Sequence, residues 1–405
     1  MMFPENQIFK VAMYFSSTAG IWPLIFEKHP TLKLCYMTYH MILRSEFFVF
    51  ILRAYFQLVC LIGEDDLNVQ EIFGNLCITL IYTVAILRLR ALNRPAVVEL
   101  FNHVIAEENN ILSHNDAIVV ALYKKAVRKA HILNKLFLFN GWLITLFYFI
   151  HPLLTEDRVI VVNNATTYIK LLPLSTWWPF DAQKHYTVAY VWNVIDGIVG
   201  SQFVTNTDIL TFTLIIYASG RIEILGQKFK NFSVYVKRLR YEGRVFCAEK
   251  AAETALKTLI FEHLQIIRYI DIFNEAMKYI MLFDFLQCSI QMATIILQLL
   301  VMEITFVNVI IVGQFFLTMI IRLVIYYYNA NEIIHLSQNW AVDIWWSDWY
   351  DQTINIQRMM AVMILRVQKP LKLLIGPFSA MSLETFIAIL KATYSYMMLF
   401  NNTSG

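Results

Sequence analysis

Side chains that are small or polar, apart from Leu399, recur at helical spacing near the C-terminus. Ala388, Ala392, Ser395, Leu399 and Asn402 follow one another at steps of four, three, four and three, which puts them on one face of a helix. The rest of that helix, from about 381 to 400, is Phe, Ile, Leu, Met and Tyr. Such a face either packs closely against another helix or lines a water-filled pore, and the spacing alone favours packing.

Several charged residues lie inside otherwise apolar stretches, where charges are costly and mark paired or functional positions, and three of them are Asp196, Arg322 and Lys391. We expect Asp196 to pair with an Arg or Lys of another span; a hydrogen bond to a polar ligand is the alternative. Arg322 receives the same structural interpretation. Lys391 lies off the small-residue face, so we expect it to face neighbouring helices or to snorkel.

The sequence carries no pattern of enzyme chemistry. It has no HExxH, GxSxG or P-loop motif and no paired carboxylates on adjacent turns of a span. The five cysteines have no metal or redox spacing, and we expect free thiols, with a Cys60–Cys77 disulfide as the alternative. We therefore expect no enzyme, no metal and no cofactor.

The composition indicates a protein with several membrane spans. Of 405 residues, 58% are hydrophobic and 15% aromatic, and the mean hydropathy is +0.53. A soluble chain of this size is nearer half apolar. We predict an all-α protein with seven transmembrane helices, at about 36–62, 72–92, 132–154, 188–218, 279–301, 306–328 and 378–402.

The segments between the predicted spans are expected to lie on one or the other side of the membrane. Residues 1–35 are expected to be an interfacial cytosolic segment, and the loop 155–187 carries a glycosylation sequon at Asn164 that suits an extracellular position. Charged amphipathic stretches at 219–278 and 329–372 predict helical extensions of the spans into the cytosol. A helix at about 353–372 is separated from the terminal span by Gly376 and Pro377, because proline cannot continue a helix.

The distribution of Lys and Arg among the connections predicts how the chain is oriented in the membrane. The second connection, residues 88–131, has seven Lys and Arg and the fourth, residues 221–278, has eleven, whereas the first and fifth have none and the third has three. The positive-inside rule then predicts a cytosolic N-terminus and an extracellular C-terminus. This is opposite to a G-protein-coupled receptor.

The C-terminal third, about 315–402, resembles the insect odorant receptor family. The resemblance rests on Asn329-Ala-Asn-Glu332 with Ser337, on the WWSDWY stretch from Trp345 to Tyr350, and on residues 363–397, MILRVQKPLKLLIGPFSAMSLETFIAILKATYSYM. The first three hundred residues agree with the family in span number, orientation and loop sizes.

The resemblance implies a ligand-gated, non-selective cation channel in the plasma membrane of a sensory neuron dendrite. Family members combine a tuning subunit with the odorant co-receptor (Orco) in a heterotetramer around a central pore, and cytosolic helices form a shared anchor. This chain lacks the co-receptor's long insertion between spans four and five, so it resembles a tuning subunit. The implied partners are the co-receptor, a small volatile odorant, the lipid bilayer and permeating cations, with no nucleic acid.

The resemblance also assigns roles to residues. On the terminal helix, Leu399 matches the residue that forms the hydrophobic constriction of the family's pore. Asn402 matches the ring of polar side chains on the extracellular side of that constriction, and Ser395 matches the pore wall on its cytosolic side. Four aromatic residues of the predicted cytosolic anchor, here called the anchor aromatics, are expected at a contact between subunits. The alternative is that they form an aromatic belt at the membrane interface. They are Trp345, Trp346, Trp349 and Tyr350. The ligand is expected in the outer half of spans two, three, four and six, at Phe73, Leu76, Leu80, Thr145, Tyr148, Phe149, His151, Tyr190, Val194, Ile195, Val312, Phe315 and Phe316.

Two other receptor classes remain as alternatives. A gustatory receptor shares the terminal helix but fits KPLKLLIGPFSAMSLETF less well. A metabotropic seven-span receptor requires the opposite topology.

Overall fold

Long uninterrupted apolar runs fold into helices that extend along most of the molecule. The computed structural model describes residues 7–22, 30–63, 69–113, 116–155, 158–162, 165–241, 247–301 and 306–403. The helices are α1 (Lys10–Thr18), α2 (Pro30–Ile62), α3 (Val69–Leu92), α4 (Pro95–Leu112), α5 (Ala117–Leu154), α6 (Tyr186–Lys230), α7 (Phe232–Tyr241), α8 (Ala248–Val301), α9 (Phe306–Trp345), α10 (Ile354–Val367) and α11 (Leu383–Thr403). Two antiparallel strand pairs join them: β1 (Arg158–Val162) with β2 (Ala165–Ile169), and β3 (Leu374–Ile375) with β4 (Ser379–Ala380).

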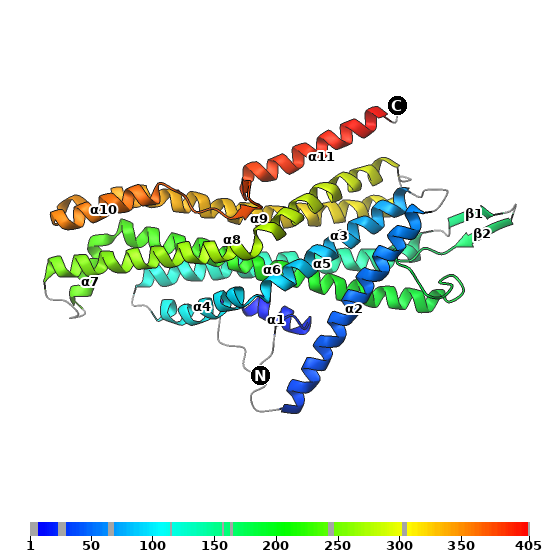
Figure 1. The fold of residues 1–405 in the computed structure, drawn as a ribbon, viewed down its shortest axis with the longest axis horizontal. Helices are drawn as coiled ribbons and strands as arrows, with labels where there is room; N and C mark the ends of the chain where they lie inside the picture. The colour runs from blue at the N-terminus through cyan, green and yellow to red at the C-terminus, as the bar shows by residue number, and fades with distance from the viewer. Residues whose placement is uncertain are drawn as a thin grey trace.

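Seven helices form the transmembrane fold. Within the described residues, α2, α3, α5, α6, α8 and α9 are long and apolar enough to cross a membrane, and α11 is the seventh. Figure 1 shows that one end of the bundle carries β1 and β2, here called the hairpin end, and that the other carries α7 and α10, here called the α10 end. The C-terminal helix α11 leans away from the other helices (Figure 1).

Helix α6 is the centre of the bundle. In its apolar window 94% of the residues are buried, compared with 28% in α2 and 33% in α5 and α9. It packs against α5, α9, α3 and α8. Its buried residues include Thr205, Asn206, Thr207 and Asp208, so the core of the bundle is partly polar.

The long helices were predicted better than their boundaries. The prediction that the helix at 246–278 continues into the fifth span is confirmed, since α8 runs without a break from Ala248 to Val301. Helix α5, in contrast, begins at Ala117 instead of at 132. Its basic residues lie on the helix surface and form pairs: Lys125 Nζ lies 2.7 Å from Glu223 of α6, and Lys129 pairs with Glu332 of α9.

The break at Gly376 and Pro377 is a reverse turn between β3 and β4. Helix α10 ends at Val367, five residues before the predicted 372. Gly376 has a φ of +59°, in the left-handed region, and its N–H donates to the carbonyl of Lys278 on α8 at 2.7 Å. The turn therefore fixes the start of α11 against the middle of α8.

The N-terminal segment packs into the bundle at its described residues. Ile8 and Phe9 are fully buried, and the backbone N–H groups of Gln7 and Ile8 donate to the carboxylate of Glu108 on α4 at 2.7 and 3.0 Å. Tyr123 of α5 donates to the same carboxylate at 2.8 Å. Burial raises the pKa of Glu108 above its usual value.

Candidate ligand cavity

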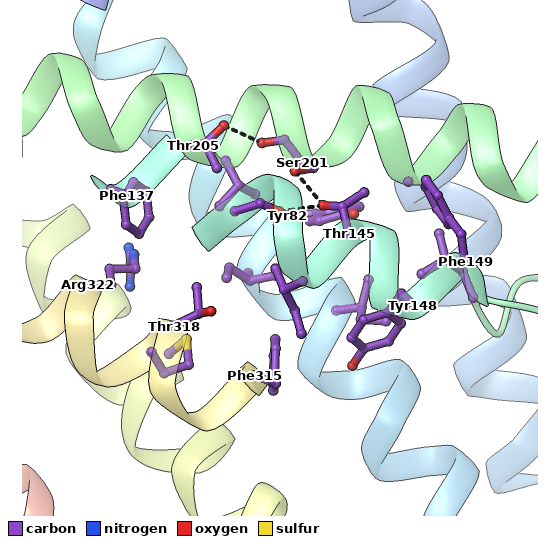
Figure 2. Close-up of a pocket in the computed structure, with 18 residues that line it drawn as sticks. Tyr82, Phe137, Thr145, Tyr148, Phe149, Ser201, Thr205, Phe315, Thr318 and Arg322 are labelled. Atoms are coloured by element: carbon purple, nitrogen blue, oxygen red, sulfur yellow. Dashed lines mark hydrogen bonds between the residues drawn. The ribbon is translucent and has the colours of Figure 1, made fainter. Parts of the chain in front are cut away.

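A cavity of about 110 Å3 lies inside the bundle between α3, α5, α6 and α9 (Figure 2). Its walls are mainly apolar and aromatic. The lining residues are Ile78, Ile81, Tyr82, Phe137, Gly141, Ile144, Thr145, Tyr148, Phe149, Leu174, Gly197, Ser201, Val204, Thr205, Phe315, Thr318, Met319 and Arg322. An engineered cavity of about 150 Å3 in another protein binds benzene, so this space has the scale of a small volatile molecule.

Leu174 closes the cavity toward the hairpin end. It is 5% exposed and belongs to the extended segment that follows β2. The segment is held to the helices by polar contacts: the N–H of Leu174 donates to Asn193 of α6 at 2.7 Å, and Asn75 of α3 donates to the carbonyl of Ser175 at 2.7 Å. Ser175 in turn donates to Glu71 at 2.9 Å.

Glycines let helices and aromatic rings approach each other around the cavity. A Cβ atom at Gly197 would lie 2.6 Å from the ring of Phe149, and one at Gly200 would lie 2.3 Å from the ring of Tyr82. A Cβ at Gly141 would lie 2.5 Å from Thr205. All three distances are too short for real atoms, so a larger residue at these positions would displace the side chains of Phe149, Tyr82 or Thr205.

Hydroxyl groups form the polar part of the wall. Thr145 and Ser201 have their hydroxyl oxygens 2.8 Å apart, and Thr205 donates to the carbonyl of Ser201 at 2.7 Å (Figure 2). Thr145 also reaches the carbonyl of Gly141 at 2.7 Å, and Thr318 donates to the carbonyl of Gln314 at 2.9 Å. These groups satisfy one another and the helix backbone.

Arg322 joins the cavity to a buried cluster of charges. Its guanidinium donates to Asp208 of α6 at 2.9 Å and to Asp284 of α8 at 2.6 Å. Arg88 of α3 contacts the same two carboxylates at 2.5 and 3.1 Å, and Tyr326 donates to Asp208 at 2.7 Å. We call Arg88, Asp208, Asp284 and Arg322 the charge cluster. It has two positive and two negative groups and connects four helices.

Most of this arrangement is not evident from the sequence. A structural role was expected for Arg322 without a named partner, because the cluster residues are up to 196 positions apart in the chain. The expected pairing of Asp196 is confirmed: its carboxylate lies 2.6 Å from Arg53 of α2. The sequence signal that could have predicted these ion pairs is the presence of acidic and basic residues at similar depth in different spans.

Four of the predicted ligand positions line the cavity: Thr145, Tyr148, Phe149 and Phe315. The others do not, most of them because on α3 and α6 the cavity lies farther from the hairpin end than expected. Leu80 and Phe316 lie at the depth of the cavity but on another face of their helices. On α3 the lining residues are Ile78, Ile81 and Tyr82, and on α6 the lining begins at Gly197. The predicted positions outside the lining are Phe73, Leu76, Leu80, His151, Tyr190, Val194, Ile195, Val312 and Phe316. For all the predicted positions, contact with a ligand stays a prediction.

The predicted pore positions lie on α11. Ser395 is exposed and donates to the carbonyl of Lys391 at 3.0 Å. Leu399 and Asn402 belong to the helix, but their side chains lie outside the described part of the chain. The same applies to the whole of Asn164.

The anchor aromatics are largely exposed at the α10 end. Trp345, Trp346 and Tyr350 expose 61%, 73% and 62% of their surface, and Trp349 packs against the core with its ring 5.8 Å from that of Trp345. The five cysteines are free thiols, Cys60 and Cys77 included.

Comparison with known proteins assigns the chain to a family. Residues 68–394 match the family model described as 7tm Odorant receptor. The chain belongs to this odorant receptor family. The receptor is therefore a multi-pass membrane protein of a receptor and ion-channel family and not an enzyme.

The receptor's curated relatives come from several insects. It is 24% identical over 297 residues to Odorant receptor 30a of Drosophila melanogaster, covering 73% of each chain. It is 23% identical to Odorant receptor Or2 of Anopheles gambiae, covering 82% of this chain and 84% of that one. Odorant receptor 10 of Aedes albopictus is 31% identical over 150 residues, or 37% of this chain and 40% of that one.

The receptor's fold matches solved structures over nearly its whole length. The insect olfactory receptor OR5 from Machilis hrabei, in a structure described as a complex with eugenol, superposes with a TM-score of 0.80 at 15% identity. The match covers 99% of this chain and 98% of that one. A second structure of the same receptor superposes with a TM-score of 0.73 at 14% identity, covering 96% of each chain.

Proposed function

We propose that this chain is the odorant-binding subunit of a ligand-gated, non-selective cation channel. The cavity between α3, α5, α6 and α9 carries this proposal, because its lining is mainly apolar and aromatic and its size is that of a small volatile molecule. The relative from Machilis hrabei is described as an olfactory receptor in complex with eugenol, a molecule of this chemical class.

Contacts link the cavity to the terminal helix α11, so that ligand binding can affect that helix. Arg322 lines it and also belongs to the charge cluster, which holds α3, α6, α8 and α9 together. Helices α8 and α9 are also the packing partners of α11. A ligand that shifts α9 therefore changes the support of the terminal helix. This is a contiguous route from the ligand to the helix that we assign to the pore.

The pore in this proposal is formed by α11 of several subunits. Its face carries Ser395, with Leu399 as the hydrophobic constriction and Asn402 as the polar ring. The partner is the odorant co-receptor in a heterotetramer, to which the exposed anchor aromatics contribute contact surface. The N-terminus is cytosolic, the C-terminus is extracellular, and Asn164 is the glycosylation site in the extracellular loop.

The test is electrophysiological. Cells that express the chain with an odorant co-receptor should give inward cation currents to at least one member of a panel of small volatile compounds, whereas the chain or the co-receptor alone should not give the same response. Epitope tags supply the topological control, with the C-terminal tag accessible on intact cells and the N-terminal tag accessible only after permeabilisation. The opposite accessibility would contradict the channel assignment.

A further inference from the structure

Tyr82 is a buried polar side chain of the cavity wall. Only 8% of its surface is exposed, and its ring packs against Phe47 and Phe50 of α2 at centroid distances of 5.5 and 5.2 Å. Its hydroxyl end packs next to Gly200 of α6, where a Cβ atom would lie 2.5 Å from the hydroxyl oxygen. Among the described residues its hydroxyl has no hydrogen-bond partner. Tyr82 lines the cavity, and a phenol hydroxyl that no described residue engages can donate a hydrogen bond to a ligand in that space.

The neighbouring polar groups of the cavity are already engaged. Thr145, Thr205 and Thr318 contact backbone carbonyls, and Arg322 donates to Asp208, Asp284 and the sulfur of Cys288. Tyr148 also lines the cavity, but Figure 2 shows its hydroxyl directed away from Tyr82 and Thr145. Among the described lining residues, Tyr82 and Tyr148 therefore have hydroxyl groups that no other described residue engages, and Tyr82 is the more deeply buried of the two.

The charge cluster offers no unpaired charge to an ionised ligand. The charge cluster at one end of the cavity is balanced, with two guanidinium groups against two carboxylates. An acid would meet no uncompensated positive charge. An amine would find both carboxylates engaged by arginines. Burial of an unpaired ion in such surroundings is too costly, so the ligand is neutral.

We propose that Tyr82 donates a hydrogen bond to the ligand, so that the cavity selects small neutral molecules with a hydrogen-bond acceptor, such as a ketone, aldehyde or ester oxygen, over hydrocarbons of the same shape. This inference rests on the proposed function and names the ligand class of the same cavity. A site with a buried donor rejects an analogue that lacks the acceptor, because the donor is then left unpaired.

The experiment compares ligand pairs that differ only in the acceptor. The probes are acetophenone with α-methylstyrene and 2-heptanone with 2-methyl-1-heptene, in which a methylene group replaces the carbonyl oxygen. Dose–response curves are recorded from cells that express the wild-type chain, Tyr82→Phe or Tyr55→Phe with the co-receptor. Tyr55 is the matched control, since its hydroxyl lies 2.9 Å from that of Thr83 and the residue does not line the cavity.

The wild type should respond to a ketone at lower concentration than to its alkene. Tyr82→Phe should raise the half-maximal concentration for the ketone about tenfold and change that for the alkene less than about twofold. Tyr55→Phe should change neither. Surface labelling checks that Tyr82→Phe reaches the membrane, as expected from its retained ring.

Two results would overturn the assignment of Tyr82 while leaving the proposed function intact. One is a wild type that responds equally to ketone and alkene. The other is a Tyr82→Phe variant that shifts both members of a pair alike or shifts neither. A wild-type chain that gives no current to any volatile compound would instead overturn the proposed function itself.

Discussion

Asp208 is the residue on which the packing of the bundle core depends most. It is fully buried and accepts hydrogen bonds from Arg88, Arg322 and Tyr326. Asp208→Asn would leave two buried guanidinium groups with only Asp284 between them. We expect a loss of about 3–5 kcal/mol of stability, because an uncompensated buried charge remains. Thermal unfolding of the purified protein in detergent measures this loss.

An exposed aspartate provides the control for Asp208. Asp181 lies in the segment before α6 with 49% of its side chain exposed, and asparagine can still accept the hydrogen bonds from the N–H groups of Gln183 and Lys184. Asp181→Asn should therefore change the melting temperature far less than Asp208→Asn. Combining Asp208→Asn with Arg88→Met should recover part of the loss, because the number of unpaired charges falls. A single Asp208→Asn variant as stable as Asp181→Asn would contradict the proposed importance of the cluster.

Glu108 gives the receptor a pH-dependent contact outside the membrane spans. Its pKa is raised by burial, so the folded state binds this proton more tightly than the unfolded state. The stabilisation is complete below the pKa of the unfolded chain and is lost as the pH rises through the folded pKa. Melting temperatures measured upward from about pH 4 should show this fall, and Glu108→Gln should flatten it. An unchanged slope in Glu108→Gln would exclude this residue as the source.

At the level of helices, the glycines of α6 and α5 determine the size of the cavity. A Cβ at Gly197 would displace the ring of Phe149, which lines the cavity. Gly197→Ala should therefore reduce the response to the larger active ligands by about tenfold or more while smaller ones lose less. Dose–response curves over a series of ligand sizes measure this.

Gly313 of α9 is the matched control, because no atom lies within 4 Å of a Cβ placed there. Gly313→Ala should leave the responses unchanged and should not lower the stability, since alanine is the better helix former. Equal effects of the two substitutions would show that helix propensity, and not cavity size, is responsible.

The positions of the helices along the chain were predictable from the sequence, whereas the face that each helix turns toward the cavity was not. Apolar runs and helical spacing predicted seven spans and the continuous α8, because both signals are local. The early start of α5 was missed because Lys125 and Lys129 suggest a connecting loop until Glu223 and Glu332 are placed beside them. The cavity residue Tyr82 was missed for a related reason: the face of α3 that turns toward Gly200 depends on the packing of other helices.

At the level of the whole molecule, α11 is packed on one side only within one subunit, where Ile389 and Thr393 are buried. It packs against α8 and α9 but leans away from the rest of the bundle (Figure 1), and Ile387 and Tyr394 expose 48% and 59% of their surface. This arrangement suits a helix that meets its counterparts in other subunits, as the proposed function requires.

The assembled channel should respond to changes at the proposed constriction. Leu399→Ala should raise the resting current or alter ion permeation in cells that also express the co-receptor, because a wider apolar ring is more easily wetted. The effect is diluted in a mixed tetramer, since this subunit supplies only part of the ring. The neighbouring Met398→Ala is the control and should leave the resting current unchanged. Equal currents in the wild type and Leu399→Ala would contradict the position of the constriction.

The order of the charge cluster along the chain matters for how the receptor is made. Membrane helices are inserted in the order of synthesis, and a charge at a helix centre costs about 2.5–3.5 kcal/mol to insert. Arg88 enters first, and Asp208, 120 residues later, neutralises it. Asp284 and Arg322 then follow 38 residues apart, on successive helices. The running charge is thus +1, 0, −1 and 0, so the growing chain never carries more than one unmatched cluster charge into the bilayer.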